Sequence, residues 1–385
     1  MSIRLFPPTF QAWESNNSDR QIAVLMSGGV DSSVAGLLLK EAGWSVLGIT
    51  MKIPVAQQCS HPSPCCGAGA AVICRQLGIS HYFLDVEGAF DKLIISPFRR
   101  AYAQGRTPSP CADCNSLLKF SLVWDFLEET FGIKNLATGH YARIVRKSGS
   151  AYLARASDRQ RDQSYFLYGT PHDRLTQLVF PLGELSKQEV RELAHRNRFE
   201  VAERPDSMEL CFAGEANYRN ALEETSASSG PILDTAGKVL GHHQGISNFT
   251  VGQRRGLGVA AGAPLYVVRI CPQDNSVTLG TREQASRRDV RAKQVNTFQP
   301  ERLRPGEKLF GQIRSPGQAS ACTIVEVGPE ATLVEFAEPQ FGPCSGQRLV
   351  LYDEDGLVAA GGTIDYANGQ QPSGQAETRT HIGGD

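Results

Sequence analysis

The sequence contains no run of about 18 consecutive apolar residues, so it predicts no transmembrane helix. Residues 1–20 lack the continuous apolar segment of a secretory signal, and the acidic Glu14 and Asp19 argue against a transit peptide. Positive charge is not in excess either, because 39 Lys and Arg residues face 40 Asp and Glu residues. We therefore expect a cytoplasmic protein that does not contact a membrane. A nucleic-acid-binding surface would need its positive charge gathered on one face.

The composition is that of an ordinary folded protein. The chain has 385 residues, of which 41% are hydrophobic and 21% charged, and this length predicts two or three domains. Ten cysteines in a chain without a predicted export signal indicate a reducing compartment. There, thiols are core residues or take part in catalysis or metal binding.

The order of apolar and polar segments predicts an α/β fold. The apolar run 22–26 is typical of a strand buried on both faces, and a helical pattern and a second apolar run at 46–51 follow it. Such a βαβ unit implies a parallel sheet. Beyond about residue 283, short alternating runs with turn signals predict a small antiparallel β-barrel. We expect an N-terminal extension (1–20), an α/β nucleotide-binding domain (21–214), a small central domain (215–282), the barrel (283–367) and a disordered tail (368–385).

Residues 27–32 (Ser-Gly-Gly-Val-Asp-Ser) lie between the first predicted strand and helix. Glycines let the backbone approach a ligand closely, and a helix N-terminus offers unpaired N–H groups and a positive dipole end. The segment therefore predicts a phosphate-binding loop. It is neither a Walker loop, which needs Gly-Lys-Ser/Thr, nor the G-x-G-x-x-G of dinucleotide-binding folds. The alternative is a glycine-rich turn that only caps the helix.

Two further segments contain cysteines. Cys111 and Cys114 form a C-x-x-C pair in the proline-containing segment 105–115. We expect Cys114 just before a helix, where the helix dipole and free N–H groups stabilise a thiolate. The pair alone also fits a redox dithiol or half of a zinc site, but no second C-x-x-C completes four ligands. Cys211 stands between two large apolar residues, and by itself it fits a buried core position.

Six motifs follow one another along the chain: SGGVDS (27–32), GRTPSPCADCN (105–115), ATGHY (137–141), DQSYFL (162–167), DSMELCFAGE (206–215) and GQRRGLG (252–258). Together they resemble the tRNA-specific 2-thiouridylase family, within the pyrophosphate-loop ATP pyrophosphatases. The resemblance extends from about residue 22 to residue 364. It implies an enzyme that adenylates the C2 oxygen of the wobble uridine of tRNA with ATP. Sulfur from a cysteine persulfide then replaces that oxygen and forms 2-thiouridine.

The resemblance also implies roles for individual residues. Cys114 corresponds to the nucleophile and Cys211 to the cysteine that carries the persulfide sulfur, and sulfur release leaves a disulfide between them. ATP and Mg²⁺ are implied as cofactors, with Asp31 placing the metal, and tRNA and a cysteine desulfurase or relay protein as partners. The positions that match ATP contacts are Leu25, Met26, Ser27, Gly28, Gly29, Val30, Asp31, Ser32, Met51 and Gly139. The positions that match tRNA contacts are Ser109, Pro110, Cys111, His140, Arg161, Asp162, Gln163, Arg314, Ser315 and Gln347.

Two segments depart from the family pattern. Many members have Asn-Pro-Asp where this chain has Ser-Pro-Cys at 109–111, so a third cysteine replaces an acid. Cys111, Cys114 and Cys211 could instead hold a [4Fe–4S] cluster with one open iron for the transferred sulfur. This is the alternative to the persulfide route, which needs only the two cysteines that match the family. The family usually has Arg-Tyr at 314–315, so the Arg-Ser found here lacks a stacking ring.

Several residues and functions stay open. Cys59, Cys65, Cys66 and Cys74 could bind zinc, although their spacing favours ordinary thiols. A nitrogen-transferring pyrophosphate-loop ligase would not need Cys114 and Cys211, and an intact phosphate loop argues against a tRNA-binding scaffold without activity. Basic residues beyond the first domain form a candidate phosphate track: Arg254, Arg255, Arg282, Arg287, Arg288, Arg291 and Lys293.

Overall fold

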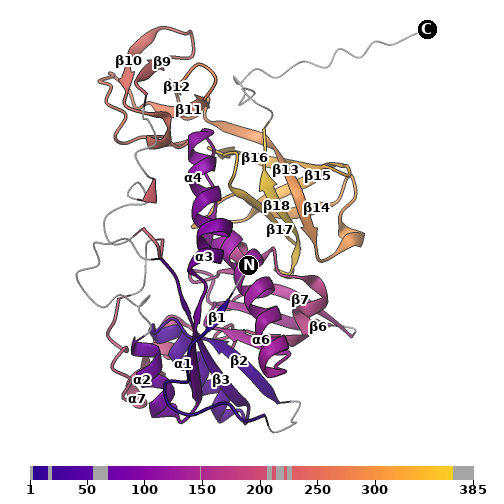
Figure 1. Cartoon of the computed structure of the whole chain (residues 1–385). Helices are drawn as coiled ribbons and strands as arrows, with labels where there is room; N and C mark the ends of the chain where they lie inside the picture. Colours follow the sequence, from indigo (N-terminus) through magenta and orange to yellow (C-terminus); the bar gives the residue numbers. More distant parts are fainter. Residues whose placement is uncertain are drawn as a thin grey trace.

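The computed structural model describes residues 3–15, 20–54, 68–147, 149–205, 210–213, 221–222 and 228–366. Cys59, Cys65 and Cys66 of the candidate zinc site lie outside these residues, as does the predicted disordered tail, whereas Cys74 is buried in α2 (Ala68–Leu77). Within them, an α/β unit, a small sheet and a closed barrel follow one another along the chain (Figure 1). No helix in these segments is both long enough and apolar enough to cross a membrane.

The first unit is built on a six-stranded sheet of order β1-β4-β3-β2-β5-β8. Its strands are β1 (Arg4–Leu5), β2 (Gln21–Leu25), β3 (Ser45–Lys52), β4 (Ser80–Asp85), β5 (Asn135–Thr138) and β8 (Leu178–Val179). All pairs are parallel except β1 with β4, which confirms the predicted parallel sheet. The chain proceeds from β2 to β3 and β4 and then returns to β5 on the other side of β2. The topological switch point therefore lies at the carboxyl ends of β2 and β5.

Helices cover both faces of this sheet. In β2, Ile22 and Val24 pack into one core and Ala23 and Leu25 into the other, which explains why the strand is apolar at every position. One face is covered by α1 (Val30–Glu41), α2 (Ala68–Leu77) and α7 (Lys187–Arg196). The other is covered by α3 (Glu87–Phe90), the π-helix η2 (Asp91–Ile95), α4 (Ser96–Ala103), α5 (Pro110–Asp113), the π-helix η3 (Cys114–Val123) and α6 (Trp124–Phe131).

A hairpin that the sequence analysis did not identify completes the first unit. It consists of β6 (Ala142–Lys147) and β7 (Ser150–Arg155), and the 3-10 helices η4 (Ser164–Leu167) and η5 (His172–Gln177) follow it. Asp162 lies just before η4 with only 4% of its side chain exposed. Its carboxylate accepts hydrogen bonds from the N–H groups of Ala156 and Ser164 at 3.0 and 3.2 Å and pairs with Arg155 at 2.8 Å. This carboxylate ties the hairpin to η4.

Two further β assemblies follow, a mixed sheet and an antiparallel barrel. The central sheet has the order β10-β9-β12-β11, and the predicted antiparallel barrel is confirmed as a closed barrel of order β13-β16-β15-β14-β17-β18. The central elements are β9 (Gly230–Leu233), β10 (Val239–His243), η7 (Ile246–Asn248), β11 (Tyr266–Cys271) and β12 (Ser276–Gly280). The barrel elements are β13 (Ser286–Thr297), η8 (Pro300–Arg302), β14 (Lys308–Gln312), β15 (Ser320–Val327), β16 (Ala331–Phe341), β17 (Arg348–Tyr352) and β18 (Val358–Ile364).

The barrel packs directly on the first unit. Val350, Tyr352 and Val358 of the barrel belong to the same apolar core as residues of β2 and α3. The hydroxyl of Tyr165 in η4 donates to the Arg348 carbonyl and accepts from the Arg348 N–H, both at 3.1 Å. The orientation of the barrel is therefore fixed by both apolar and polar contacts.

The segment that precedes Cys111 contacts all three units. In Figure 1, α4 extends from the first unit toward the central sheet. A Cβ added at Gly105 would lie 2.8 Å from the side chain of Ile270 in β11, so the backbone approaches the central sheet closely. The Thr107 N–H donates to the Ser345 carbonyl of the barrel at 2.9 Å.

We expect Asp162→Ala to lower the free energy of unfolding by about 3–5 kcal/mol, because it removes one partner of a buried ion pair. Urea denaturation measures the change. Asp355→Ala is the matched control, since Asp355 and Lys147 form an exposed pair that should contribute about 0–1 kcal/mol. Equal losses in the two variants would contradict a stabilising role for the buried carboxylate.

Candidate active site

The predicted phosphate loop lies at the switch point, between β2 and α1. Gly28 has a φ of +78°, which glycine adopts without strain, and Gly29 is the N-cap of α1. The hydroxyls of Ser27 and Ser32 lie 3.2 Å apart, and the Ser32 hydroxyl also accepts from the Ser27 N–H. The loop thus brings the N-terminus of α1 to the carboxyl end of the sheet, where α/β proteins bind phosphate groups.

The other predicted ATP contacts lie around this loop. Leu25, Met26 and Val30 are buried beneath it, and Met51 is half-buried near the end of β3. Arg204, which the sequence analysis did not select, donates from Nη1 to the Gly28 carbonyl at 3.4 Å. The loop therefore has an apolar base and a guanidinium at its side.

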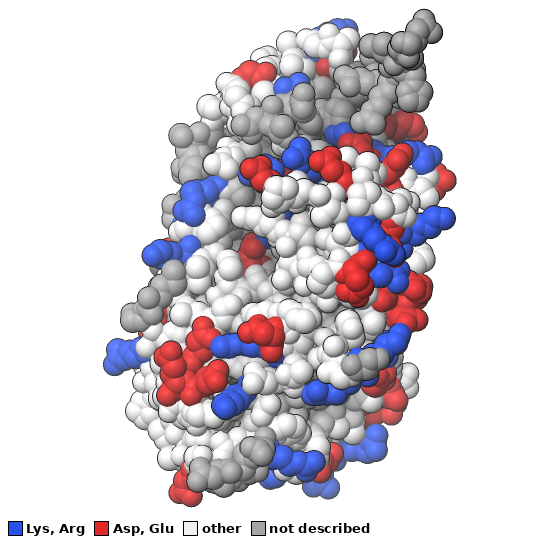
Figure 2. Space-filling model, turned by 90° about the vertical axis from the view of Figure 1, so that its right-hand side faces the viewer, with Lys and Arg blue, Asp and Glu red and all other residues white. Residues whose placement is uncertain are grey.

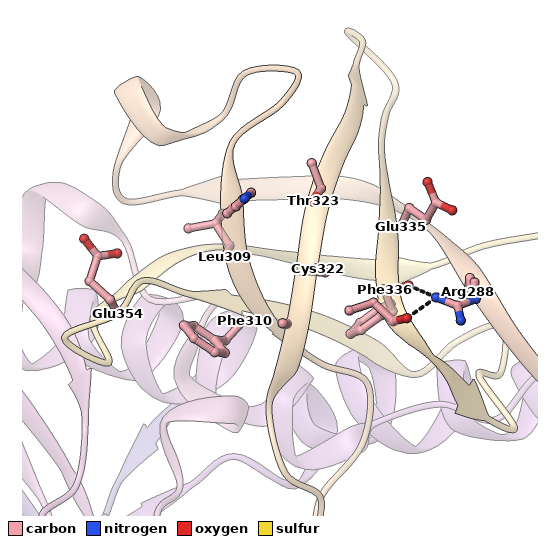
Figure 3. A pocket seen from close by; sticks show the side chains of 11 residues that line it. Arg288, Leu309, Phe310, Cys322, Thr323, Glu335, Phe336 and Glu354 are labelled. Carbon is pink, nitrogen blue, oxygen red and sulfur yellow. Dashed lines mark hydrogen bonds between the residues drawn. The ribbon is translucent and has the colours of Figure 1, made fainter.

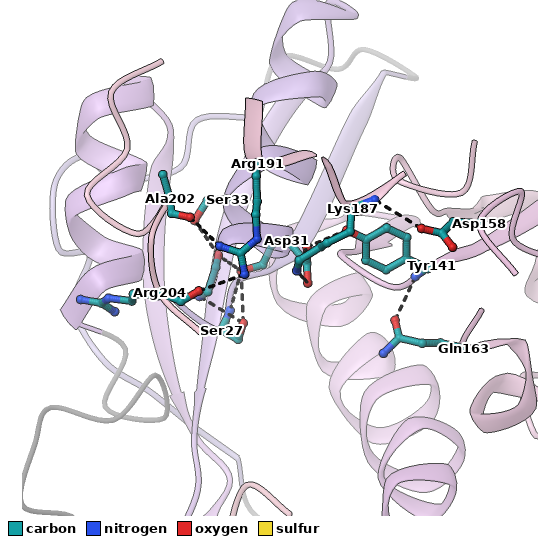
Figure 4. A network of polar contacts seen from close by, with 12 residues as sticks. Ser27, Asp31, Ser33, Tyr141, Asp158, Gln163, Lys187, Arg191, Ala202 and Arg204 are labelled. Carbon is teal, nitrogen blue, oxygen red and sulfur yellow. Dashed lines mark hydrogen bonds and ion pairs between the residues drawn. The ribbon is translucent and has the colours of Figure 1, made fainter. Parts of the chain in front are cut away.

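Asp31, in the first turn of α1, is held by residues from two other elements (Figure 4). Lys187 Nζ lies 2.8 and 2.9 Å from its two carboxylate oxygens, and the Tyr141 hydroxyl donates to Oδ1 at 2.9 Å. Lys187 is the first residue of α7, and its side chain is 10% exposed. The sequence analysis missed both partners. Tyr141 ends the ATGHY motif and Lys187 follows the capping residue Ser186, but spacing alone does not show that α7 folds back onto the loop.

Gly139 lies against the backbone of the phosphate loop. A Cβ added there would lie 2.7 Å from the backbone nitrogen of Ser32 and 2.8 Å from the carbonyl carbon of Asp31. Backbone atoms cannot move aside as a flexible side chain can, so only glycine fits. The chain after β5 therefore contacts the start of α1 directly.

His140 extends this contact to a second helix. Its Nδ1 forms a 2.7 Å hydrogen bond with the Thr138 hydroxyl, and its ring centroid lies 6.3 Å from that of Phe120 in η3. Burial and the charge of Lys119 lower the pKa of His140 well below its ordinary value. The ring is therefore neutral at pH 7, and it fits a hydrogen-bonding role rather than binding of phosphate by charge.

Cys111 and Cys114 lie in one helical run that comprises α5, η3 and α6. The prediction that Cys114 precedes the helix is wrong. Ser109 is the N-cap and Pro110 takes the first position, where its missing N–H has no intrahelical partner to lose. Cys114 is thus the fifth helical residue, beyond the first turn in which the dipole acts. It begins a π-helical stretch, a conformation found frequently at functional sites.

Burial opposes ionisation of both thiols. Cys114 is 8% exposed, and burial raises its pKa. Cys111 is exposed when the whole residue is considered, but its thiol is surrounded by protein. Burial of the thiol raises its pKa to about 11. The charge of Lys119 acts in the opposite direction on both thiols. Since the helix dipole does not reach Cys114, a thiolate there depends on such a charge.

Cys211 lies on the same face of the sheet as Cys114. It is exposed, and the ring of the following Phe212 packs edge-on against Phe90 of α3 and Phe98 of α4, with centroids 5.8 and 5.3 Å apart. Neither of these two described cysteines forms a disulfide in this structure. Within the segments that the structure describes, no three His, Cys, Asp or Glu side chains are arranged to hold a metal ion.

Two neighbouring barrel residues hold the segment that leads to the cysteines. Gln347 Nε2 donates to the carbonyls of Thr107 and Pro108 at 3.2 and 3.3 Å. Arg348, with 7% of its side chain exposed, pairs with Asp113. Gln347 was predicted as a tRNA contact, whereas the pair of Arg348 with Asp113 was missed, because nothing in the sequence links residues so far apart.

The other predicted tRNA contacts differ in accessibility. The Asp162 carboxylate is enclosed by the protein, and Gln163 Oε1 accepts from the Tyr141 N–H at 2.9 Å, so both side chains shape the site from within. Ser109 and Pro110 are buried, His140 and Arg314 are half-buried, and Arg161 and Ser315 are exposed.

The candidate basic track is partly neutralised. Arg287 and Lys293 pair with neighbouring carboxylates. Arg282 and Arg314 both lie over the ring of Phe341, with guanidinium carbons 4.3 and 5.5 Å from its centroid, and neither has an acidic partner among the described residues. On the face shown in Figure 2, Lys and Arg are interspersed with Asp and Glu and do not form one continuous basic area.

A pocket of about 570 Å³ opens on the barrel, remote from the phosphate loop (Figure 3). Lys308, Phe310, Thr323 and Glu335 are among the residues that line it, and the Arg288 guanidinium donates to the Phe336 carbonyl at 3.3 Å. Apart from Arg288 of the candidate phosphate track, none of the predicted site residues lines this pocket, so we assign no part of the chemistry to it.

A phosphate-binding loop at the switch point of a parallel sheet is the arrangement of a nucleotide-binding α/β domain. Three family models match the chain: "tRNA methyl transferase HUP domain" (20–215), "tRNA methyl transferase PRC-barrel domain" (221–281) and "Aminomethyltransferase beta-barrel domain" (287–364). The chain is 42% identical over 354 residues to the tRNA-specific 2-thiouridylase MnmA 1 of Syntrophus aciditrophicus, covering 90% of this chain and 93% of the relative. It is 40% identical over 385 residues to the tRNA-specific 2-thiouridylase MnmA of Bradyrhizobium sp., covering 96% and 95%.

The chain therefore belongs to the tRNA-specific 2-thiouridylase family. Among solved structures, the U34-tRNA thiolase NcsA from Methanococcus maripaludis with its [4Fe–4S] cluster is 20% identical, with a TM-score of 0.34. That match covers 50% of this chain and 62% of the other, and a likeness this distant carries no argument about mechanism.

We expect Asp31→Asn to reduce tRNA-dependent pyrophosphate release by about 100-fold, as when a preorganised electrostatic group is removed from a reaction centre. Tyr141→Phe keeps the carboxylate and removes one of its hydrogen bonds, so its loss should be smaller. Pyrophosphate release is measured beside tRNA binding on filters, which both variants should retain. Normal pyrophosphate release by Asp31→Asn would remove Asp31 from the reaction.

Proposed function

We propose that this protein catalyses ATP-dependent 2-thiolation of the wobble uridine of tRNA, with Cys211 carrying a persulfide sulfur and Cys114 releasing it. The observation that carries the proposal is the position of the two residues that follow β5. Gly139 contacts the phosphate loop, and His140 contacts the helix that contains Cys114. An ATP-activating loop and a nucleophilic thiol joined in this way fit sulfur transfer, and the family relatives support the same reaction. A cytoplasmic location follows from this proposal, because tRNA and ATP are present there.

Activation begins at the C2 oxygen of uridine, which is a poor leaving group as a carbonyl. This oxygen attacks the α-phosphorus of ATP, the bond to the bridging oxygen breaks, and pyrophosphate leaves while uridine loses its N3 proton. The N–H groups at the start of α1, with Lys187 beside them, would stabilise the negative charge of pyrophosphate. Asp31 would bind Mg²⁺ through a carboxylate oxygen released from Lys187, and the metal, which uses one or two carboxylates together with phosphate oxygens, would neutralise the same charge.

Sulfur transfer then uses the two cysteines. A cysteine desulfurase or relay protein leaves Cys211 as a persulfide. The Cys114 thiolate attacks the inner sulfur, the persulfide S–S bond breaks, and hydrosulfide leaves as the Cys114–Cys211 disulfide forms. Hydrosulfide attacks C2, AMP departs with the original oxygen, and the proton of hydrosulfide returns to N3. An external dithiol reduces the disulfide for the next cycle. The base leaves the anticodon stack to reach the thiols, at a cost of a few kcal/mol.

The alternative sulfur carrier is a [4Fe–4S] cluster on Cys111, Cys114 and Cys211. Such a cluster needs its thiolates gathered around one site. The structure describes all three cysteines, and it does not gather them into a metal-binding group. We therefore derive no step through a cluster, and Cys111 has no direct part in the proposed reaction.

We expect Cys111→Ser to form 2-thiouridine in tRNA at most of the wild-type rate, because the persulfide route uses only Cys114 and Cys211. Nucleoside mass spectrometry of tRNA incubated with ATP and a persulfide donor measures the product, and Cys114→Ser is the inactive control. The iron content of wild type prepared without oxygen is determined in parallel. An inactive Cys111→Ser variant that also loses about four irons per chain would favour the cluster.

Affinity for tRNA should fall linearly with salt on logarithmic axes, because Lys and Arg release counterions from phosphates. Replacing Arg254 and Arg255 by Gln should reduce the slope by about one for each lost phosphate contact. Arg287→Gln is the matched control, since Arg287 already pairs with Asp289. Filter binding between about 50 and 200 mM salt measures the slopes. Equal slopes for wild type and the Arg254/Arg255 variant would remove these arginines from the interface.

A further inference from the structure

Lys119 is a half-buried cation beside the cysteines to which the chemistry above gives no role. It has no acidic partner among the described residues. Its ammonium group donates to Asn115 Oδ1 at 2.9 Å. Asn115 is 2% exposed, and its Nδ2 donates to the Phe166 carbonyl at 3.0 Å, which fixes the orientation of the amide. The ammonium is thus held in one place by a neutral group that leaves its charge uncompensated.

The π-helical conformation of η3 brings Lys119 to the side of Cys114. In an α-helix, the side chain five positions after Cys114 would point about 140° away from that of Cys114, because one turn takes 3.6 residues. A π-helix closes its hydrogen bonds between residues i and i+5, so Lys119 lies about one turn beyond Cys114. Ten π-helical residues are far more than the single-turn bulge usually seen. The π-helical conformation therefore places the Lys119 side chain on the same side of the helix as Cys114.

The charge of Lys119 acts on the groups around it. Burial raises the pKa of Cys114, and among charged groups Lys119 has the largest effect on this pKa, in the lowering direction. Asp113 raises it, but Asp113 is itself paired with Arg348 of the barrel. A partly desolvated cation without a counter-ion does not favour folding, so its position points to a functional use.

The elements packed against η3 contribute few other charges. The titratable and charged groups they present, beside those of the helical run itself, are Glu87 of α3, Asp91 and Lys92 of η2, Tyr165 of η4, His140 after β5 and Arg348 of β17. Glu87 pairs with Lys52, and Asp91 and Lys92 are exposed, so solvent screens them. His140 is neutral at pH 7. Lys119 therefore dominates the field at the thiol.

We propose that Lys119 is the positioning residue that favours the thiolate form of Cys114, the form that attacks the sulfur on Cys211. The inference rests on the proposed function, in which Cys114 releases hydrosulfide from the persulfide. Cys114 gives its proton to solvent before the attack, and the ammonium stays protonated throughout. Without that charge the buried thiol would ionise less readily still, and sulfur release would be slower.

The pH dependence of Cys114 alkylation tests this role without any turnover. The rate of reaction with iodoacetamide is followed by tandem mass spectrometry in a Cys111→Ser background, so that the modified helix reports Cys114 alone. Lys119→Met should shift the profile to higher pH and slow alkylation at pH 7 about tenfold, the effect of one pKa unit on the thiolate fraction. Lys119→Arg should keep the wild-type profile, because it keeps the charge.

Lys134→Met is the matched control, since Lys134 is exposed beyond the end of α6, and it should leave the profile unchanged. Thermal melting establishes that each variant is folded. If Lys119→Met does not fold, Lys119→Gln takes its place, because Gln retains a hydrogen-bond donor for Asn115. An unchanged profile in the neutral variant would overturn the inference. Failure of wild type to form 2-thiouridine would instead overturn the proposed function, so the two failures are distinguishable.

Discussion

One close backbone contact joins the two halves of the site. The chain leaving β5 passes so near the first turn of α1 that a single methyl group at Gly139 would collide with the backbone of Asp31 and Ser32. This contact exists because the strand order reverses at β2, which brings the carboxyl ends of β2 and β5 together. The next residue, His140, contacts the helix of Cys114. In the proposed reaction, nucleotide activation and sulfur transfer would thus share one edge of the sheet.

The barrel holds the other side of the site. A Cβ at Gly346 would lie 2.8 Å from the Thr107 carbonyl oxygen, so these two segments of the chain are in contact through their backbones. The Gln347 side chain is held in place, because its amide donates to two carbonyls of this segment. Its neighbour Arg348 pairs with Asp113. If tRNA binds the barrel as proposed, it would contact a surface that Gln347 and Arg348 connect to the helix of Cys114 and to the segment before it.

Much of the fold could be predicted from local pattern, because buried parallel strands are continuously apolar and barrel strands alternate. The hairpin β6–β7 was missed, since its strands are short and mixed in polarity. The start of this helix was predicted at about Asn115 and lies at Pro110, because the apolar periodicity begins only after Cys114. Long-range partners such as Lys187 and Arg348 could not be predicted. Their roles depend on which elements the fold brings together, and a single sequence does not state that.

Tracing oxygen-18 from the C2 position of the wobble uridine tests most directly whether the protein adenylates the base before sulfur transfer. A tRNA labelled at that oxygen is incubated with the protein, ATP and a persulfide donor, and the AMP released is analysed by mass spectrometry. The proposed reaction predicts one labelled oxygen in the phosphate of AMP for each 2-thiouridine formed. Unlabelled AMP accompanied by 2-thiouridine would contradict it, because the oxygen would then have left the base by another route.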